Sequence, residues 1–435
     1  MHWQHSIRFE GESTLSGLPE SPAVFALRSE RPDSEPYVNK AANLRKRLER
    51  LLSPASPDSK RLNLAASTHT IEYTVTGSDF GNRLLLYRAL REQFPRSYRK
   101  RMKLIPAALV KIGWENEYPR AYFTRRLGRI ALLPTAAKAG APESTKSTTS
   151  TSSIYYGPFA SKAAANKFMN DALDLFKSRR CTFNINPDPS FPGCMYSEMK
   201  MCLAPCFAGC THDEYMHEIA RVQQYLDSHG SSLVAQLEAE RDAASTQLEF
   251  EQASAIHSRI EKAKEPWNGI PEIVGRIDRL RAVIVQRSAL PDHVALFDFR
   301  NGLLHGPLQF NVQGMQHANP NSGSSSLYAH PHLAAPVPLE DSKASPKAKP
   351  QTLESRVAEA ISGIPTRKPE RGEAADHLAL LKRWFYRSTK KGEIFISHTD
   401  ELPLRRIVRG ISRLFQSEPP AAAHGSMPGA KPSTE

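Results

Sequence analysis

The chain has 435 residues, more than the roughly 250–300 over which a single hydrophobic core normally grows, so several folded units are expected. Its 58 Lys and Arg against 45 Asp and Glu give a net charge of +13, which favours a polyanionic partner such as nucleic acid over an ordinary basic surface. No run approaches the ~20 apolar residues that span a bilayer, and the first residues lack an apolar signal-peptide core. A membrane or secreted protein is therefore not expected, and a cytoplasmic location is the default.

Three tracts rich in Pro, Ala, Ser, Thr and Lys divide the chain. Such compositions bury too little apolar surface to fold, so we expect a flexible linker, a disordered insert and a disordered tail. These are residues 131–153, 315–372 and 416–435. The remaining units predict an α+β multidomain protein: 18–130, 154–210, 211–265, and a C-terminal unit made of 268–314 and 373–415.

The first unit opens with two short apolar runs, Val24–Leu27 and Tyr37–Val38, separated by polar turn residues. This pattern predicts a β-hairpin. The following sequence, AANLRKRLERLL, places leucines at helical spacing with basic residues around the rest, which predicts a basic amphipathic helix.

The sequence from LPESPAVF to YVNKAANLRKRL resembles the signature of the GIY-YIG endonuclease domain at the amino terminus of the UvrC family. The resemblance implies a GIY-YIG-like α/β domain over residues 18–130. Its chemistry needs a tyrosine hydroxyl, an arginine against the scissile phosphate and a glutamate for one divalent metal.

Only part of that catalytic set has a counterpart here. Tyr37 and Arg47 match the second tyrosine and the arginine, whereas Phe25 replaces the first tyrosine and Tyr87, in RLLLYRAL, replaces the metal-binding glutamate. Without a carboxylate, Mg²⁺ is not expected to bind. Glu92 could supply one only if the alignment shifted. We therefore expect a nuclease-deficient domain.

A positive field persists in this unit. Between Arg88 and Arg126 there are eleven Lys or Arg and three acidic residues, interleaved with aromatic residues. This composition suits contact with DNA phosphates and bases, although a solvated basic face over an aromatic core is the alternative. The candidate DNA-binding residues are Lys40, Arg45, Lys46, Arg96, Arg99, Lys100, Arg101 and Lys103.

The second unit, 154–210, contains all five cysteines of the chain. Clustered cysteines in a cytoplasmic protein indicate metal or iron–sulfur ligation, with unliganded buried thiols as the alternative. The stretch CMYSEMKMCLAPC resembles the cysteine region of the UvrC family, and the resemblance favours a [4Fe-4S] cluster, with zinc as the competitor. Cys210 has no counterpart in that pattern. The candidate ligands are Cys181, Cys194, Cys202 and Cys206.

Residues 211–265 predict one helix followed by a helical hairpin, from their apolar spacing. The segment LEFEQAS resembles the core of the UVR domain, through which UvrC and UvrB pair, so the resemblance implies a UvrB-like partner. The candidate contacts are Phe250, Ala253, Ile256 and Ile260. The alternative is that this face packs on the chain's own core.

The C-terminal unit predicts two strands joined at Asn301-Gly302, then the helix HLALLKRWFYR, the strand GEIFIS and the helix LPLRRIVRGISRLF. This small α/β region resembles the part of UvrC that precedes its ribonuclease-H-like domain. We expect a truncated homologue that lacks that domain and the helix-hairpin-helix domain.

The resemblance as a whole implies a nuclease-deficient adaptor of nucleotide excision repair that binds DNA and UvrB, with UvrA as a further partner. Two alternatives are a residual GIY-YIG endonuclease that makes a single incision and a UVR-bearing regulatory protein outside repair. Proteins of the latter class tend to carry paired CxxC sites, which this sequence lacks.

Overall fold

The computed structural model describes residues 2–31, 33–53, 62–128, 153–312, 352–365, 367, 369–370, 372–399 and 401–416. Within them lie three antiparallel four-stranded sheets and a set of helices, so the expected mixed α/β multidomain architecture is confirmed. The expected linker, except residue 153, and nearly all of the expected tail lie outside the described residues.

The first sheet has the strand order β1-β4-β2-β3. Its predicted hairpin is confirmed, because β2 and β3 pair antiparallel with Phe25 opposite Asn39. The unit begins before residue 18, since β1 pairs with β4 at the sheet edge. The elements are β1 (His5–Arg8), α1 (Glu12–Ser16), β2 (Ala23–Arg28), β3 (Tyr37–Ala41), α2 (Leu44–Leu52), η1 (Ala65–Ser67) and β4 (Thr70–Val75).

The predicted basic helix is α2. Asn43 caps its start by accepting a hydrogen bond from the Lys46 backbone N–H at 3.0 Å, and the four leucines of the helix are buried under the sheet. The next helices are α3 (Asp79–Gln93), capped by Ser78, and α4 (Tyr98–Arg101).

The second sheet, β6-β5-β7-β8, crosses two predicted unit boundaries. Strand β5 pairs on one side with β6 and on the other with β7, and β8 is the outer neighbour of β7. The sheet therefore joins strands that the prediction placed in the separate units 18–130 and 154–210. The strands are β5 (Ala108–Ile112), β6 (Ala121–Thr124), β7 (Ile154–Phe159) and β8 (Gly275–Arg276).

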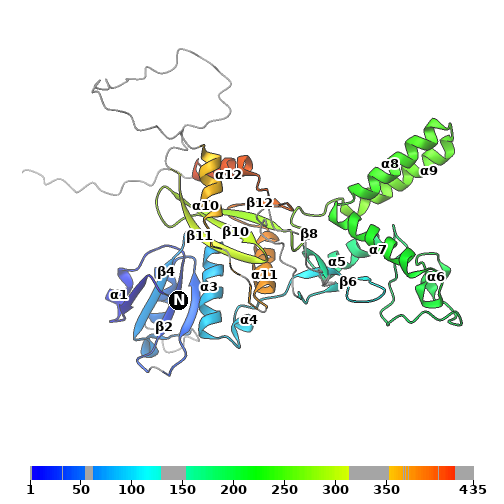
Figure 1. Cartoon of the computed structure of the whole chain (residues 1–435). Coiled ribbons are helices and arrows are strands. Elements are labelled where there is room, and N and C mark those ends of the chain that lie inside the picture. Colours follow the sequence, from blue (N-terminus) through cyan, green and yellow to red (C-terminus); the bar gives the residue numbers. More distant parts are fainter. Residues whose placement is uncertain are drawn as a thin grey trace, which may run out of the picture.

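Helices dominate residues 162–267. The predicted single helix and helical hairpin are confirmed as α7 and the α8–α9 pair, which projects away from the sheets (Figure 1). The elements are α5 (Lys162–Leu173), α6 (Met195–Glu198), η2 (Pro205–Phe207), α7 (His212–Asp227), α8 (Ser231–Thr246), α9 (Phe250–Lys264) and η3 (Glu265–Trp267).

The third sheet has the order β11-β10-β9-β12. The predicted turn at Asn301-Gly302 joins β10 to β11, with φ of 53° and 75°, the left-handed values that a tight hairpin turn requires. The strands are β9 (Arg281–Arg287), β10 (His293–Arg300), β11 (Leu303–Asn311) and β12 (Glu393–Ser397).

Helices cover both faces of this sheet. One face packs against α10 (Leu353–Ser362) and α12 (Leu404–Gln416), and the other against α11 (Glu373–Phe385). The prediction of a disordered insert over 315–372 is wrong at α10, which buries Val357 and Ile361. Residues 313–351 of that insert lie outside the described residues.

Helix α3 is shared between two cores. Leu86 and Leu90 pack with Val24 of the first sheet, whereas Phe80 lies 4.9 Å from Phe297 and 5.4 Å from Trp384, measured between ring centroids. The first sheet is thereby attached to α11 and the third sheet, and this attachment determines the surroundings of Tyr87.

Candidate functional site

The remnants of the expected catalytic set lie on the first sheet and α2. The Tyr37 hydroxyl accepts a hydrogen bond from Nδ2 of Asn39 at 2.9 Å, and its ring lies 6.2 Å from the fully buried ring of Phe25. Arg47 is half-buried on α2. Phe25 therefore offers an apolar ring at the position where the sequence resemblance leads one to expect a hydroxyl.

Tyr87, at the position of the expected metal-binding glutamate, faces α11. It is 1% exposed, and its hydroxyl donates to Oδ2 of Asp376 at 3.4 Å. Its ring makes edge contacts with Tyr98 at 5.8 Å and His377 at 5.0 Å. Burial, reinforced by the charge of Asp376, raises the pKa of Tyr87, so the phenol stays neutral. Among the described residues, its polar and ring contacts lie on α3, α4 and α11.

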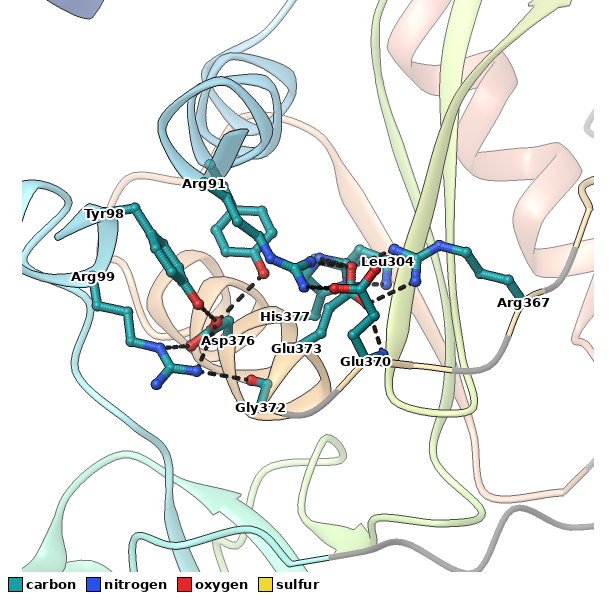
Figure 2. Close-up of polar contacts among 11 residues, drawn as sticks. Arg91, Tyr98, Arg99, Leu304, Arg367, Glu370, Gly372, Glu373, Asp376 and His377 are labelled. Carbon is teal, nitrogen blue, oxygen red and sulfur yellow. Dashed lines mark hydrogen bonds and ion pairs between the residues drawn. The ribbon is translucent and has the colours of Figure 1, made fainter. Parts of the chain in front are cut away.

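Asp376 joins α4 to α11. Its carboxylate accepts a hydrogen bond from the Tyr98 hydroxyl at 2.6 Å and two from Arg99, one from Nε at 2.8 Å and one from Nη2 at 3.1 Å (Figure 2). The carboxylate is buried, so these charge-assisted bonds offset its desolvation.

Glu373 forms a second clamp one turn earlier on α11. Its carboxylate accepts hydrogen bonds from Arg91 Nη1 at 2.6 Å and from Arg367 Nη1 at 2.7 Å, and a third from Arg367 Nη2 (Figure 2). Burial acts to raise its pKa, but the Arg367 bonds, the Glu370 backbone N–H and neighbouring charges lower the pKa of Glu373 to about 2. Glu373 is therefore ionised and fully compensated.

Sequence reasoning missed these acidic residues and His377. The only sequence signal was their spacing at i, i+3 and i+4 on a helix otherwise rich in apolar residues, which also fits a solvated face.

The candidate DNA-binding residues separate into two groups. Four are engaged in ion pairs: Lys40 with Asp79, Arg45 with Glu20 at 3.0 Å, Arg99 with Asp376, and Arg101 with Glu35 at 2.7 Å. The other four, Lys46, Arg96, Lys100 and Lys103, are exposed and form no ion pair with a described residue. Three of these lie on or beside α4.

The candidate metal ligands come together around Cys202. The pKa of the Cys202 thiol is raised to about 11, mainly by burial, with the nearby Cys181, Cys194 and Cys206 adding to the rise and the Ala204 N–H opposing it. Arg179 Nη1 lies 3.6 Å from the Cys181 sulfur, and the Ala204 N–H lies 3.3 Å from that of Cys202. All five cysteines are free thiols, and no three His, Cys, Asp or Glu side chains of the described residues are arranged as a metal site.

The four candidate partner contacts differ in exposure. Ile256 and Ile260 are buried in the main core, as the alternative reading of this face expected, and Ala253 is partly buried against it. Phe250 is 64% exposed, and Leu248, in the turn before it, is 70% exposed. The exposed apolar surface of the α8–α9 hairpin is therefore at its tip, beside a groove of about 520 Å³ lined by Glu240, Gln247, Glu249, Ile256 and Arg259.

Comparison with known proteins identifies the lineage of this chain. The model of the UvrC/Cho excinuclease middle domain matches residues 131–225, which include all five cysteines. The chain is 29% identical over 252 residues to UvrABC system protein C of Rickettsia africae, covering 57% of this chain and 35% of that protein. These matches support a UvrC-family protein.

Other UvrC relatives agree. The protein of Rickettsia canadensis is 29% identical over 277 residues, covering 62% of this chain and 40% of the relative. That of Rickettsia bellii is 28% identical over 277 residues, covering 62% and 39%. The chain thus spans about two fifths or less of the length of these UvrC proteins. No solved structure matches.

The UvrC middle-domain match ends inside α7, so the α8–α9 hairpin and the third sheet lie beyond it. In the part of the chain that the structure describes, no helix is long and apolar enough to cross a membrane.

Proposed function

We propose that this UvrC-family chain is a non-incising adaptor of nucleotide excision repair that binds DNA and a UvrB-type partner. The observation that carries the proposal is the position of Tyr87, a neutral, buried phenol bonded to Asp376 where the family pattern places a metal-binding carboxylate. A hard divalent cation needs anionic oxygen ligands, and a buried neutral phenol is a poor substitute.

Neighbouring carboxylates do not replace the missing ligand. The Asp376 carboxylate is already bonded to Tyr98 and Arg99. Glu92 is exposed and lines a cavity with Arg88 and His305, on the side of α3 that faces β11. A residual nuclease would need a carboxylate directed at Tyr37 and Arg47. This is why the binding role is preferred over the residual endonuclease.

DNA contact is assigned to the exposed cations on and beside α4, namely Arg96, Lys100 and Lys103, together with Lys46 on α2. Cations without ion-pair partners can bind phosphate without first breaking an internal bond. Arg99 is excluded from this surface because both Nε and Nη2 bond to Asp376.

Partner contact is assigned to the tip of the α8–α9 hairpin. Leu248 and Phe250 are large apolar side chains exposed on a projecting element, and exposed apolar anchors of this kind typify binding surfaces. A UvrB-type hairpin is the partner that the UVR resemblance implies.

Cys181, Cys194, Cys202 and Cys206 are proposed to hold one metal centre, either a [4Fe-4S] cluster or zinc. The donor set fits in kind and number, and the N–H groups of Arg179 and Ala204 directed at two of the sulfurs would stabilise thiolates. Such a centre would supply a rigid cross-link for residues 181–206. Binding must draw the thiols closer, since as placed they form no coordination group within the described residues.

The decisive experiment is incision of a damaged duplex in the presence of UvrA and UvrB, with and without divalent metal. The adaptor role predicts binding of DNA and UvrB without incision by this chain. Nicking that EDTA and Arg47→Ala both abolish would establish the residual endonuclease instead. Failure to bind either DNA or UvrB would favour a regulatory role outside repair.

A further inference from the structure

A cavity of about 470 Å³ lies between α3, α11 and the start of β11. This volume is within the range of pockets that bind small molecules. Most of the lining side chains are charged or imidazole groups, and the apolar lining residues Leu303 and Leu304 are themselves buried. The cavity is therefore suited to a charged, hydrogen-bonding ligand.

The lining holds three arginines and three glutamates, but only one of the glutamates lies in the interior. Glu373 is compensated by Arg91 and Arg367, as described above. Glu370 also pairs with Arg91 and is 71% exposed, and Glu92 is exposed as well, so both lie at the rim.

Arg88 is an arginine of the lining without an acidic partner among the described residues. It lines the cavity and is partly buried, yet it forms no hydrogen bond or ion pair with any described residue. Burial and the nearby Arg367 charge both lower the pKa of Arg88, and the charge of Glu373 opposes them.

His377 supplies an unused donor in the same cavity. Its Nδ1 accepts the Leu304 backbone N–H at 2.9 Å, so in the neutral ring Nε2 carries the hydrogen. Nε2 is buried without a hydrogen-bond partner, and the nearest carboxylate oxygen, on Glu373, is 3.9 Å away. The side chain is only 3% exposed and lines the cavity, so a small group in the cavity is what could approach this N–H. An unpaired buried donor is uncommon and calls for an acceptor.

We propose that this cavity binds a phosphate monoester, whose oxygens accept hydrogen bonds from the Arg88 guanidinium and from Nε2–H of His377. Phosphate offers several anionic acceptors at once, which suits a planar guanidinium together with a second, separate donor. The volume exceeds what inorganic phosphate alone needs, so a nucleoside can be attached. The ligand is either a free mononucleotide or the phosphorylated end of a DNA strand. The site is independent of the adaptor role.

The test uses the full chain, with thermal unfolding and calorimetric titration against inorganic phosphate, deoxyadenosine 5′-monophosphate and deoxyadenosine. Phosphate and the nucleotide should raise the unfolding temperature of the wild type, because a ligand that binds only the folded state stabilises it. The nucleoside should not. Arg88→Gln should weaken nucleotide binding at least about tenfold, the loss expected for one charge-assisted contact.

Two variants keep the result interpretable. Arg409→Gln removes one positive charge from the exposed side of α12, outside the cavity lining, and should bind the nucleotide as the wild type does. Without ligand, Arg88→Gln should unfold at a temperature no lower than the wild type, because the substitution removes an unpaired cation. A lower unfolding temperature would identify Arg88 as a structural residue and overturn the proposal.

The proposal also fails if neither phosphate nor the nucleotide stabilises the wild type, or if Arg88→Gln and Arg409→Gln lose affinity equally. Oligonucleotides with and without a 5′-phosphate distinguish the two sources. Preference for the phosphorylated end, abolished by Arg88→Gln, assigns a DNA terminus, whereas nucleotide binding without that preference assigns a free mononucleotide. Neither result bears on the incision assay, in which Arg88 has no role.

Discussion

Tyr87 on α3 and Asp376 on α11 are 289 positions apart in sequence, and the tyrosine hydroxyl donates to the carboxylate across 3.4 Å. Tyr98 and Arg99 bond to the same carboxylate. Tyr87, which the sequence resemblance predicts at a metal-ligand position, thus helps to attach α3 to α11.

Replacing Tyr87 by glutamate should therefore not create a nuclease. The new carboxylate would lie buried near Asp376, and an uncompensated buried charge typically costs about 3–5 kcal/mol. Denaturant unfolding should show this loss, whereas Tyr87→Phe, which removes only the hydroxyl, should cost roughly 1 kcal/mol or less. If Tyr87→Glu is as stable as Tyr87→Phe and nicks DNA with Mg²⁺, the assignment of this position is wrong.

Acid should destabilise the α3–α11 contact through His377. Burial is the main reason that the pKa of His377 is lowered to about 3, with Arg88, Arg367 and Arg91 adding to it and Glu373 opposing it. Because the unfolded chain binds a proton near pH 6.5 and the folded chain does not, stability should fall as pH drops from about 6.5 towards 3, by up to about 1.4 kcal/mol per pH unit.

The measurement is the free energy of unfolding against pH. His377→Gln should reduce the slope between about pH 6.5 and 5.5, above the range in which Glu373, whose ordinary pKa is 4.5, begins to contribute. His257→Gln, on the exposed side of α9, controls for the loss of a histidine elsewhere. An unchanged slope in His377→Gln would contradict the prediction.

Phe250→Ala should weaken binding to the C-terminal hairpin of UvrB at least about tenfold, because burying one large apolar anchor is worth ~1.5–3 kcal/mol. Calorimetric titration measures this, and DNA affinity should stay unchanged. Phe183→Ala, another exposed phenylalanine, is the control. Ile256→Asp is a poor probe, since its side chain is buried within this chain and the substitution would unfold the hairpin. Equal affinities of wild type and Phe250→Ala would move the partner surface away from the tip.

Lys100→Gln and Lys103→Gln should each weaken DNA binding similarly across sequences and reduce the slope of log affinity against log salt by about 1. Arg99→Gln should instead lower stability, because it removes the bonds to Asp376. Fluorescence anisotropy over a salt series separates these outcomes. A large loss of DNA affinity in Arg99→Gln without loss of stability would show that the ion pair opens on binding.

Cys202→Ser should destabilise residues 154–210 as a whole, because metal ligation couples binding to folding. Anaerobically purified wild type should contain iron and sulfide, or zinc, at about one site per chain. Cys210→Ser should leave both the metal content and the stability unchanged. Elemental analysis that finds neither iron nor zinc would remove the proposed centre.

Much of the local structure was encoded within short segments. Asn301-Gly302 adopts left-handed φ values at low cost and so predicts its hairpin, and the leucine spacing of residues 44–52 predicts an amphipathic helix wherever its partner lies. That Tyr87 stands where the UvrC pattern has a glutamate remains a prediction, because it depends on the resemblance and its alignment.

Tertiary structure alone decided the partners. Packing between distant segments decided three features. Strand β5 pairs with β7, and Asp376 contacts Tyr87. Ile256 and Ile260 are buried, whereas Phe250 is exposed. Turn and helix preferences act over a few neighbouring residues, whereas these contacts depend on which buried faces fit together once the chain has folded, and on which buried charges find a partner there.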